Sequence, residues 1–392
     1  MFDLASVQAA IREHGFDGWL LYDFRGSNIL ARRVLGMTDG FQSRRWYYFI
    51  PAQGEPRKLV HRIESGALDA YPGTKDVYVR WQELETEIGR LVAGAKRIAM
   101  EYVPRNTNPY ISRVDAGTIE LVRSFGPEIG SSGDLVQTFE ATWDDEQWAL
   151  HREAAIHTDS AYDVAFGAIA GAIRSGQAIR ESDVIRIILD HFDRNGLTTD
   201  HGPNCSVGPH SGDPHYETTP ATDVMIQPGD FVLIDLWAKS KKPRGVYSDL
   251  TRVAFVGAEI PAKIAEIFGI VASARDAAIA CVKDGFAAGT PVFGWQVDAA
   301  ARGVIEKAGY GAFFVHRTGH SIGQEVHGNG ANMDGLETRE DRTVMRRTCF
   351  SIEPGIYFPE WGVRSEVDVF VDVAGQVHVT GGKLQTEVVR IV

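Results

Sequence analysis

Hydrophobic and polar positions alternate over short distances up to about residue 140, and long helical patterns follow. In the first part, one helical pattern is followed by several brief apolar runs. These segments are 4–13, 18–22, 46–50, 59–61, 77–79 and 98–101. Such short runs are typical of strands, so we predict a small α/β domain over residues 1–140. The turn sequence at 53–56, Gln-Gly-Glu-Pro, predicts a hairpin between two of its strands.

A long helical pattern begins at Thr142, and one order of elements then occurs twice. Two helices, a loop and an acidic strand pair are followed by two more helices, a loop and a second acidic strand pair. The predicted segments are helices at 142–173 and 181–195, strands at 231–237 and 247–256, helices at 261–284 and 291–309, and strands at 349–357 and 363–372. Repetition of a supersecondary unit indicates a duplicated domain, which we place at residues 141–392.

Both strand pairs carry carboxylates inside apolar patterns. Asp235 shares a strand face with Leu233, because side chains alternate between the faces of a strand. Asp235 and Asp249 are 14 positions apart, and Glu353 and Glu366 are 13 apart. One acid in a strand is usually a surface charge or a cap, but a repeated pair is less easily explained in this way. If the two pairs face each other, four repelling carboxylates meet and require a cation.

A segment rich in glycine and histidine, 316–328, lies between the strand pairs. His320 stands between Gly319 and Gly323, and both glycines are expected to let the backbone approach a site closely. His316 is expected to be a packed core residue. Carboxylates with one imidazole suit manganese, cobalt, iron or zinc better than a thiolate-selected ion. Two such ions could share bridging carboxylates and activate a water molecule.

Composition limits the partners of the chain. Of its 392 residues, 44% are hydrophobic and 23% are charged, which is typical of a folded soluble protein. The net charge of -12 opposes binding to nucleic acid or to anionic membranes. We find no pattern of a membrane-spanning helix or signal peptide, so we expect a cytoplasmic protein. Three widely spaced cysteines predict buried thiols rather than disulfides or a zinc ribbon.

Five separated motifs resemble those of the pita-bread metallopeptidase family, which includes methionine aminopeptidase, aminopeptidase P, prolidase and the metal-free creatinase. The motifs are Pro214-His215-Tyr216, Ile234-Asp235, Ser248-Asp249-Leu250-Thr251-Arg252, Gly319-His320-Ser321-Ile322-Gly323 with His327, and Ile352-Glu353-Pro354-Gly355 followed by Val363-Arg364-Ser365-Glu366. The resemblance implies an α+β fold with a pita-bread catalytic domain of two related halves at 141–392. A creatinase-like N-terminal α/β domain would occupy 1–140.

The resemblance also implies two divalent metal ions, with manganese preferred and cobalt, zinc or iron as alternatives. Asp249 and Glu366 would bridge both ions. Asp235 would complete the ligands of one ion, and His320 and Glu353 those of the other. Every ligand position of the family pattern carries a suitable residue in this chain.

Four residues would act on the substrate. The resemblance implies that Glu353 is the general base, and that His215 and His327 steady the scissile carbonyl and the tetrahedral intermediate. Arg364 matches an arginine of the proline-specific branch of the family, and a salt bridge at a strand edge is its alternative role. A bond before proline lacks an amide hydrogen, so proteases that grip an extended backbone cleave it poorly.

A basic segment connects the first two acidic strands. Residues 239–244 contain three lysines and Arg244, although the whole chain is acidic. A solvated hairpin tip is the simpler interpretation and the one that we favour. The sharper hypothesis is that Arg244 binds the free carboxylate of a short substrate, as a dipeptidase requires.

The predicted function is hydrolysis of Xaa-Pro bonds by a metal-bridging hydroxide. A prolidase-like Xaa-Pro dipeptidase is favoured, and an aminopeptidase P-like enzyme acting on longer peptides is the alternative. A hydrolase of a non-peptide metabolite and a non-catalytic binding protein on the same fold remain as other classes. A homodimer is the assembly that the resemblance implies.

Overall fold

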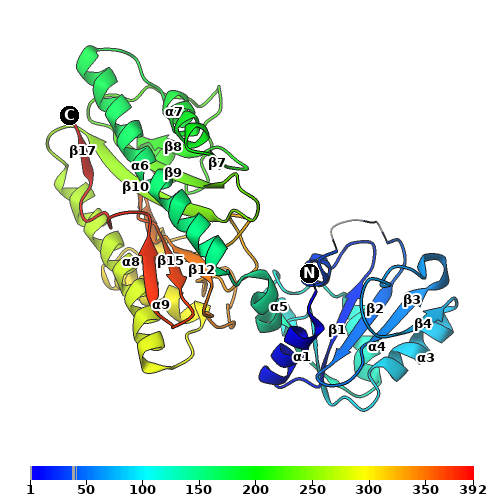
Figure 1. Cartoon of the computed structure of the whole chain (residues 1–392). Coiled ribbons are helices and arrows are strands. Elements are labelled where there is room, and N and C mark those ends of the chain that lie inside the picture. Colours follow the sequence, from blue (N-terminus) through cyan, green and yellow to red (C-terminus); the bar gives the residue numbers. More distant parts are fainter. Residues whose placement is uncertain (1, 38–39, 41) are drawn as a thin grey trace. The chain divides into compact units, whose positions relative to one another are not determined.

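The computed structural model of the protein describes residues 2–37, 40 and 42–392. The chain divides into two compact units, Met1–Glu140 and Ala141–Val392 (Figure 1). Within the described residues, we find no helix that combines the length and the apolar character needed to cross a membrane.

The first unit contains one sheet of six strands in the order β4-β3-β2-β1-β5-β6. Its strands are β1 (Gly18–Asp23), β2 (Trp46–Pro51), β3 (Arg57–His61), β4 (Thr74–Tyr78), β5 (Arg97–Met100) and β6 (Glu128–Ser131). Its α-helices are α1 (Leu4–Glu13), α2 (Ile29–Leu35), α3 (Trp81–Leu91), α4 (Ala116–Ser124) and α5 (Gly133–Glu140). Strands β2 and β3 are antiparallel, as the turn sequence at 53–56 predicted.

Helices cover both faces of this sheet because its central strands are apolar on both sides. Trp19 and Leu21 of β1 pack in a core with residues of α1, α2 and α5. Leu20 and Tyr22 of the same strand point the other way and pack in a core with residues of α3 and α4. The unit is therefore a three-layer α/β domain, the class that the short apolar runs predicted.

The second unit is built around a long antiparallel hairpin. Its α-helices are α6 (Asp145–Ser175), α7 (Glu181–Arg194), α8 (Ala262–Ala288) and α9 (Gly294–Lys307). Its strands are β7 (Leu197–Thr198), β8 (Asn204–Val207), β9 (Phe231–Ser240), β10 (Tyr247–Val256), β11 (Ser321–Ile322), β12 (Cys349–Ile352), β13 (Gly355–Tyr357), β14 (Gly362–Arg364), β15 (Val367–Val371), β16 (Val377–Thr380) and β17 (Val389–Ile391). The hairpin of β9 and β10 places Thr251 directly opposite Asp235.

Two cores lie on opposite faces of this hairpin. Val232 and Ile234 of β9 pack in a core with residues of α6 and α7. Phe231 and Leu233 pack in a second core with residues of α8, α9, β12 and β15. The predicted alternation of side chains along this strand is confirmed. Each core belongs to one pair of helices, which matches the predicted duplication.

The second acidic strand pair differs from the prediction of two continuous strands at 349–357 and 363–372. The first strand is broken between β12 and β13 at Glu353 and Pro354, and the second between β14 and β15 at Ser365 and Glu366. β12 pairs with β15, whereas β13 pairs with β14 in a separate two-stranded sheet. Because proline donates no backbone hydrogen bond, the ladder cannot continue through 354. The break leaves both acids outside regular pairing.

Candidate metal centre

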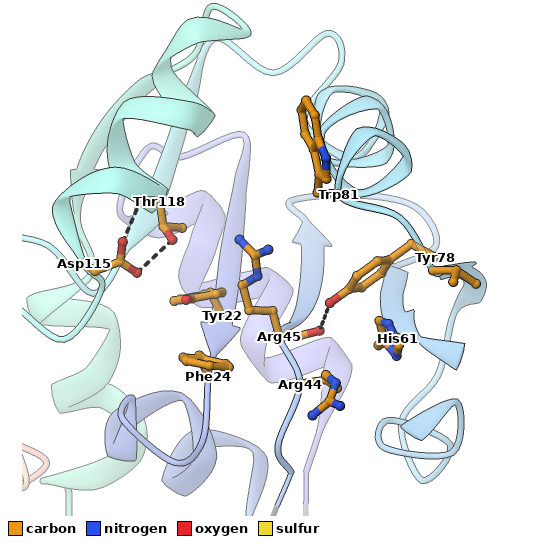
Figure 2. A pocket seen from close by; sticks show the side chains of 10 residues that line it. Tyr22, Phe24, Arg44, Arg45, His61, Tyr78, Trp81, Asp115 and Thr118 are labelled. Atoms are coloured by element: carbon orange, nitrogen blue, oxygen red, sulfur yellow. Dashed lines mark hydrogen bonds between the residues drawn. The ribbon is translucent and has the colours of Figure 1, made fainter. Parts of the chain in front are cut away.

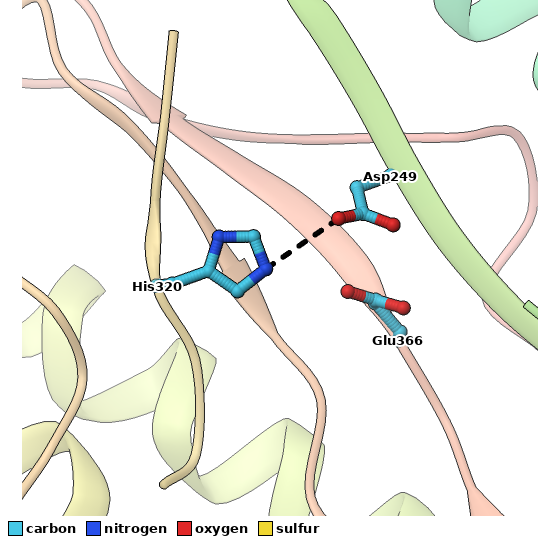
Figure 3. Close-up of side chains that lie close together, drawn as sticks. All are labelled: Asp249, His320 and Glu366. Atoms are coloured by element: carbon cyan, nitrogen blue, oxygen red, sulfur yellow. Dashed lines mark ion pairs between the residues drawn. The ribbon is translucent and has the colours of Figure 1, made fainter. Parts of the chain in front are cut away.

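Three buried residues of the second unit bring possible metal ligands together. One ligand atom from each of Asp249, His320 and Glu366 lies within 4.8 Å of the others. Figure 3 shows both carboxylates turned toward the imidazole of His320. Asp249 lies on β10, His320 immediately precedes β11, and Glu366 immediately precedes β15. Three segments far apart in the sequence therefore meet at one point.

The protonation of His320 leaves one ring nitrogen free for a cation. Nδ1 lies 3.2 Å from the carbonyl oxygen of Ser321, a contact that is satisfied when Nδ1 carries the proton. Nε2 then has a lone pair and lies 3.4 Å from Asp249 Oδ2 and 3.5 Å from Glu353 Oε1. Burial lowers the pKa of His320, which keeps the ring neutral as metal ligation requires.

The glycines beside His320 have different roles from each other. A Cβ atom on Gly319 would lie 1.9 Å from the carbonyl oxygen of Ser351, so only glycine fits there. The backbone nitrogen of His320 donates to Ser351 Oγ at 3.0 Å, which holds the histidine against β12. At Gly323 the nearest atom to an added Cβ is 4.0 Å away, so no protein neighbour requires glycine there. Close approach of either glycine to a bound group stays a prediction.

Asp235 reaches the same region through Thr251 and Arg364. Thr251 Oγ1 donates to Asp235 Oδ1 at 3.1 Å and lies 2.8 Å from Glu366 Oε2. Arg364 NH2 pairs with Asp235 Oδ2 at 2.5 Å, and Arg364 Nε donates to Thr251 Oγ1 at 3.0 Å. The structure therefore joins Asp235 to the cluster through an arginine and a hydroxyl.

The charges of the cluster are not balanced by protein cations alone. Burial raises the pKa of Asp249, and the neighbouring Asp235 raises it further. Burial also raises the pKa of Glu366, followed by the charge of Asp249. Burial also raises the pKa of Glu353, although His320 and Arg364 oppose this increase. Carboxylates under such mutual repulsion, with a neutral imidazole among them, are a donor set that fits divalent metal ions.

The two histidines predicted to contact substrate lie on exposed loops. The rings of His327 and His320 are 4.4 Å apart in an edge-to-face arrangement. His215 follows the short helix Gly208–Gly212, and its backbone nitrogen donates to Asp213 Oδ1 at 3.0 Å. Burial lowers the pKa of His316 to about 3, with smaller contributions from Arg364 and from His215. The charge of His215 thus has a small effect at His316.

Several residues of the site were not singled out from the sequence. Thr251 stands two positions from Asp249 on β10, and this spacing on one strand face was the available signal. Asp368 accepts from Ser248 Oγ at 2.9 Å and from the backbone nitrogen of Asp249 at 3.2 Å. His316, which was expected to be a packed residue, has ring contacts with Phe314 and Tyr357, and its Nε2 lies 2.8 Å from the hydroxyl of Tyr357.

Asp298 on α9 anchors the segment that leads to His320. It accepts from the nitrogen and hydroxyl of Thr318 at 3.0 and 2.7 Å. Arg302 pairs with Asp298 at 3.0 Å and donates to the carbonyl oxygen of His316 at 2.8 Å. The carbonyl of Thr318 accepts from the nitrogen of Glu353 at 2.7 Å. The ion pair of Asp298 and Arg302 thus supports the segment that leads to His320, and through Thr318 it also supports the backbone at Glu353.

Replacing Asp298 by alanine is expected to lower stability strongly, because Arg302 would remain buried without its counter-charge. We expect a loss of about 3 kcal/mol, which is typical when one partner of a buried pair is removed. Thermal unfolding followed by calorimetry measures the effect. Asp341→Ala is the matched control, because its pair with Arg339 is 3.1 Å long but exposed. An equal decrease in melting temperature for both variants would contradict the anchoring role.

The basic segment 239–244 is tied to the acidic faces of α6 and α7. Lys241 pairs with Asp193 at 2.5 Å and Lys242 with Glu153 at 2.8 Å. Arg244 pairs with Asp144 at 2.5 Å and Glu146 at 3.1 Å. These contacts favour a hairpin tip fastened to the helices. Substrate binding by Arg244 stays a prediction.

Arg244→Ala separates the two interpretations. If the arginine only tethers the hairpin, the loss of exposed ion pairs should cost at most about 1 kcal/mol and leave dipeptide turnover unchanged. If it binds the substrate carboxylate, KM for dipeptides should increase about tenfold or more, because a charge-assisted hydrogen bond is lost. Steady-state kinetics on dipeptides and on C-terminally amidated analogues decides between these results.

The comparisons with known proteins agree with this geometry. Residues 149–372, more than half of the chain, match metallopeptidase family M24. The chain therefore belongs to this family and is a metallopeptidase, as the five motifs indicated. Its fold is the mixed α+β pita-bread fold, preceded by an N-terminal domain.

Three similar proteins illustrate the relationship. YkvY of Bacillus subtilis is 34% identical over 288 residues, which cover 70% of this chain and 72% of that protein. An Xaa-Pro dipeptidase of Lactobacillus delbrueckii subsp. lactis is 31% identical over 55% of this chain and 53% of its own length. The crystal structure of dipeptidase PepE from Mycobacterium ulcerans has a TM-score of 0.67 at 23% identity. The structural alignment covers 99% of this chain and 96% of PepE. At 23% identity, this similarity shows that the two proteins share a fold.

Proposed function

We propose that this chain is a dipeptidase that hydrolyses the bond before proline with the help of two divalent metal ions. The observation that carries the proposal is the buried cluster of Asp249, His320 and Glu366, with Arg364 beside it. Repelling carboxylates at the meeting point of three segments are costly unless a cation is bound there. Manganese is the first ion to test.

The proposed ligands are those named from the motifs: Asp235, Asp249, His320, Glu353 and Glu366. When bound, the ions would polarise the scissile carbonyl and lower the pKa of a water molecule. The structure supports Asp235 as a ligand less directly than the others, because its carboxylate contacts Arg364 and Thr251. Arg364 is positioned to hold the carboxylate of Asp235 in one orientation.

Three residues of the chain are assigned to proton transfer and to hydrogen bonding with the substrate. Glu353 has a carboxylate at the edge of the cluster, 3.5 Å from His320 and 4.0 Å from Arg364. We assign it to accept the proton of the attacking water and to return a proton to the leaving proline nitrogen. We assign His215 and His327, which lie on exposed loops, to donate hydrogen bonds to the carbonyl oxygen as it gains charge.

The preference for dipeptides rests on the similar proteins rather than on the site. The Lactobacillus protein is named an Xaa-Pro dipeptidase, and the Mycobacterium ulcerans protein is named a dipeptidase. Proline specificity also fits Arg364, which lies two positions before Glu366 and points at Asp235 within the site. Both inferences can be tested with one set of substrates.

The test uses the full chain, stripped with a chelator and reloaded with manganese, cobalt or zinc. We expect the stripped protein to be inactive and the reloaded protein to cleave Ala-Pro and Leu-Pro. Turnover of Ala-Pro should exceed that of Ala-Ala and of Ala-Pro-Ala by about tenfold or more in kcat/KM. Equal or faster cleavage of Ala-Pro-Ala would favour an aminopeptidase. No cleavage of any peptide with any of the ions would contradict the proposed function.

A further inference from the structure

The first unit contains a pocket that the proposed peptidase function does not use. Its volume is about 510 Å³, within the range of small-molecule sites. The lining residues are Tyr22, Phe24, Arg44, Arg45, His61, Tyr78, Val79, Trp81, Asp115 and Thr118. None of them is among the proposed metal ligands or substrate-contacting residues. Figure 2 shows their side chains around a common space.

The pocket lies where three strands of the sheet end. Tyr22 is near the carboxyl end of β1, His61 ends β3 and Tyr78 ends β4. Arg45 immediately precedes β2, which runs antiparallel to β1 and therefore begins at the same edge. In open α/β sheets, ligands bind at the carboxyl ends of the strands, where the connecting loops leave a crevice.

Two adjacent arginines supply positive charge to this crevice. Figure 2 shows the side chain of Arg45 between the rings of Tyr22 and Tyr78. The backbone carbonyl of Arg45 accepts from the Tyr78 hydroxyl at 2.8 Å, and Glu64 accepts from the backbone nitrogen of Arg44 at 2.9 Å. These bonds fix the main chain. Arg44 NH1 also donates to the hydroxyl and the carbonyl oxygen of Ser43, at 2.9 and 3.4 Å. Within the described part of the chain, neither arginine forms an ion pair with a carboxylate.

Aromatic rings form the remaining walls. Phe24 is 42% exposed and Trp81 is 62% exposed, although both are large apolar side chains. The rings of His61 and Tyr78 meet edge to face at 4.9 Å. Exposed rings around a concave surface are typical of a site that receives a flat apolar group. Guanidinium groups also stack favourably on such rings.

One carboxylate on the wall restricts the charge of the ligand. Asp115 accepts from the nitrogen and hydroxyl of Thr118 at 2.9 and 2.8 Å, so it is held in place at the start of α4. Hydrogen bonding to the carboxylate keeps the pKa of Asp115 below its ordinary value, although burial opposes this effect. A dianionic phosphate would be repelled by this fixed charge more than a carboxylate with a single charge.

We propose that the pocket binds a small carboxylate whose body is an aromatic or similarly flat ring. The carboxylate is bound by Arg45, in the geometry in which a guanidinium group contacts both oxygens. The ring lies between Phe24 and Trp81. This binding site is independent of the proposed peptidase function, since no lining residue takes part in it.

Isothermal titration of the full, metal-loaded chain tests the proposal with phenylacetate and indole-3-acetate as probes. We expect dissociation constants of about 1 mM or lower, and weaker binding of inorganic phosphate and of uncharged indole. Arg45→Gln should weaken binding of both aryl carboxylates about tenfold or more, because a bidentate contact is lost. Trp81→Ala should weaken the binding of indole-3-acetate more than the binding of phenylacetate. The matched control is Arg90→Gln, an exposed arginine of the same unit that pairs with Glu87 at 2.5 Å.

Arg45→Lys provides a second variant if Arg45→Gln does not fold, as judged by its melting curve, because lysine keeps the charge but loses the bidentate contact. The proposal is overturned if the unmodified chain binds neither aryl carboxylate at about 10 mM. It is also overturned if phosphate binds as tightly as the aryl carboxylates, or if the pocket variants bind as well as Arg90→Gln. If Trp81→Ala changes the oligomeric state and the unmodified chain binds no ligand, the pocket surface would contact a protein partner instead. This result would also overturn the proposal.

Discussion

Asp249→Asn is expected to lower kcat/KM for Ala-Pro by at least about a thousandfold, the equivalent of about 4 kcal/mol of transition-state stabilisation. Asp249 is the proposed bridging ligand, and its carboxylate lies 3.4 Å from His320 Nε2. An amide carries no charge and offers only one good ligand oxygen. Peptidase assays at saturating manganese, together with the metal content of the dialysed protein, measure the loss.

The same variant should fold as well as the metal-free parent. Burial and the charge of Asp235 both raise the pKa of Asp249, so the ionised carboxylate is disfavoured in the folded chain. Removing that charge relieves repulsion, and the melting temperature without metal should stay the same or increase. Asp163→Asn, on the exposed surface of α6, removes one charge elsewhere and serves as the control. Full activity in Asp249→Asn would contradict the two-metal assignment.

Glu353→Gln is expected to lower kcat by about a hundredfold to ten thousandfold, which is the range for loss of general acid and base catalysis. KM should change much less, because Glu353 is assigned to move a proton rather than to hold the peptide. Burial raises the pKa of Glu353, in the direction that suits a group that must accept a proton near neutral pH. Pre-steady-state and steady-state rates over a range of manganese concentrations separate proton transfer from metal affinity.

Glu360→Gln is the matched control for this variant, since Glu360 is exposed and lies just after β13, the strand that follows Glu353. It should retain the activity of the unmodified chain. If excess manganese restored full kcat to Glu353→Gln, the residue would be a ligand only. The assignment of the general base would then be wrong.

The order of elements and the grouping of the acids were open to prediction from the sequence. Periodicity is local, so the alternation of Val232 and Leu233 already indicated which faces of β9 would be buried. The repeated spacing of acids indicated that two hairpins would face each other. The structure brings Asp249, His320 and Glu366 together and places Glu353 next to His320. Their roles as metal ligands stay a prediction.

Other features depend on partners that are distant in the sequence. The break in the second strand pair arises where Pro354 cannot donate to the ladder and Glu366 turns toward Thr251. Gly319 is required because the carbonyl of Ser351 lies against it, whereas Gly323 meets no comparable neighbour. The contacts of Arg244 with Asp144 and Glu146 span about a hundred positions, as the sequence separations of 100 and 98 show. The basic composition of residues 239–244 does not indicate which distant acidic residues will pair with them.

The sequence by itself indicated the small α/β domain and the repeated elements through local periodicity, and the family, the pita-bread architecture and the candidate ligands through motifs that resemble those of a known family. Only the tertiary structure decided how the charges are distributed. It paired Asp235 with Arg364, set Thr251 between two acids and supported His320 through Asp298 and Arg302. It also gathered Arg45, Phe24 and Trp81 into one pocket of the first unit. The physical reason is that hydrogen bonds and ion pairs act over a few ångströms in space, and a fold brings together residues that no local pattern relates.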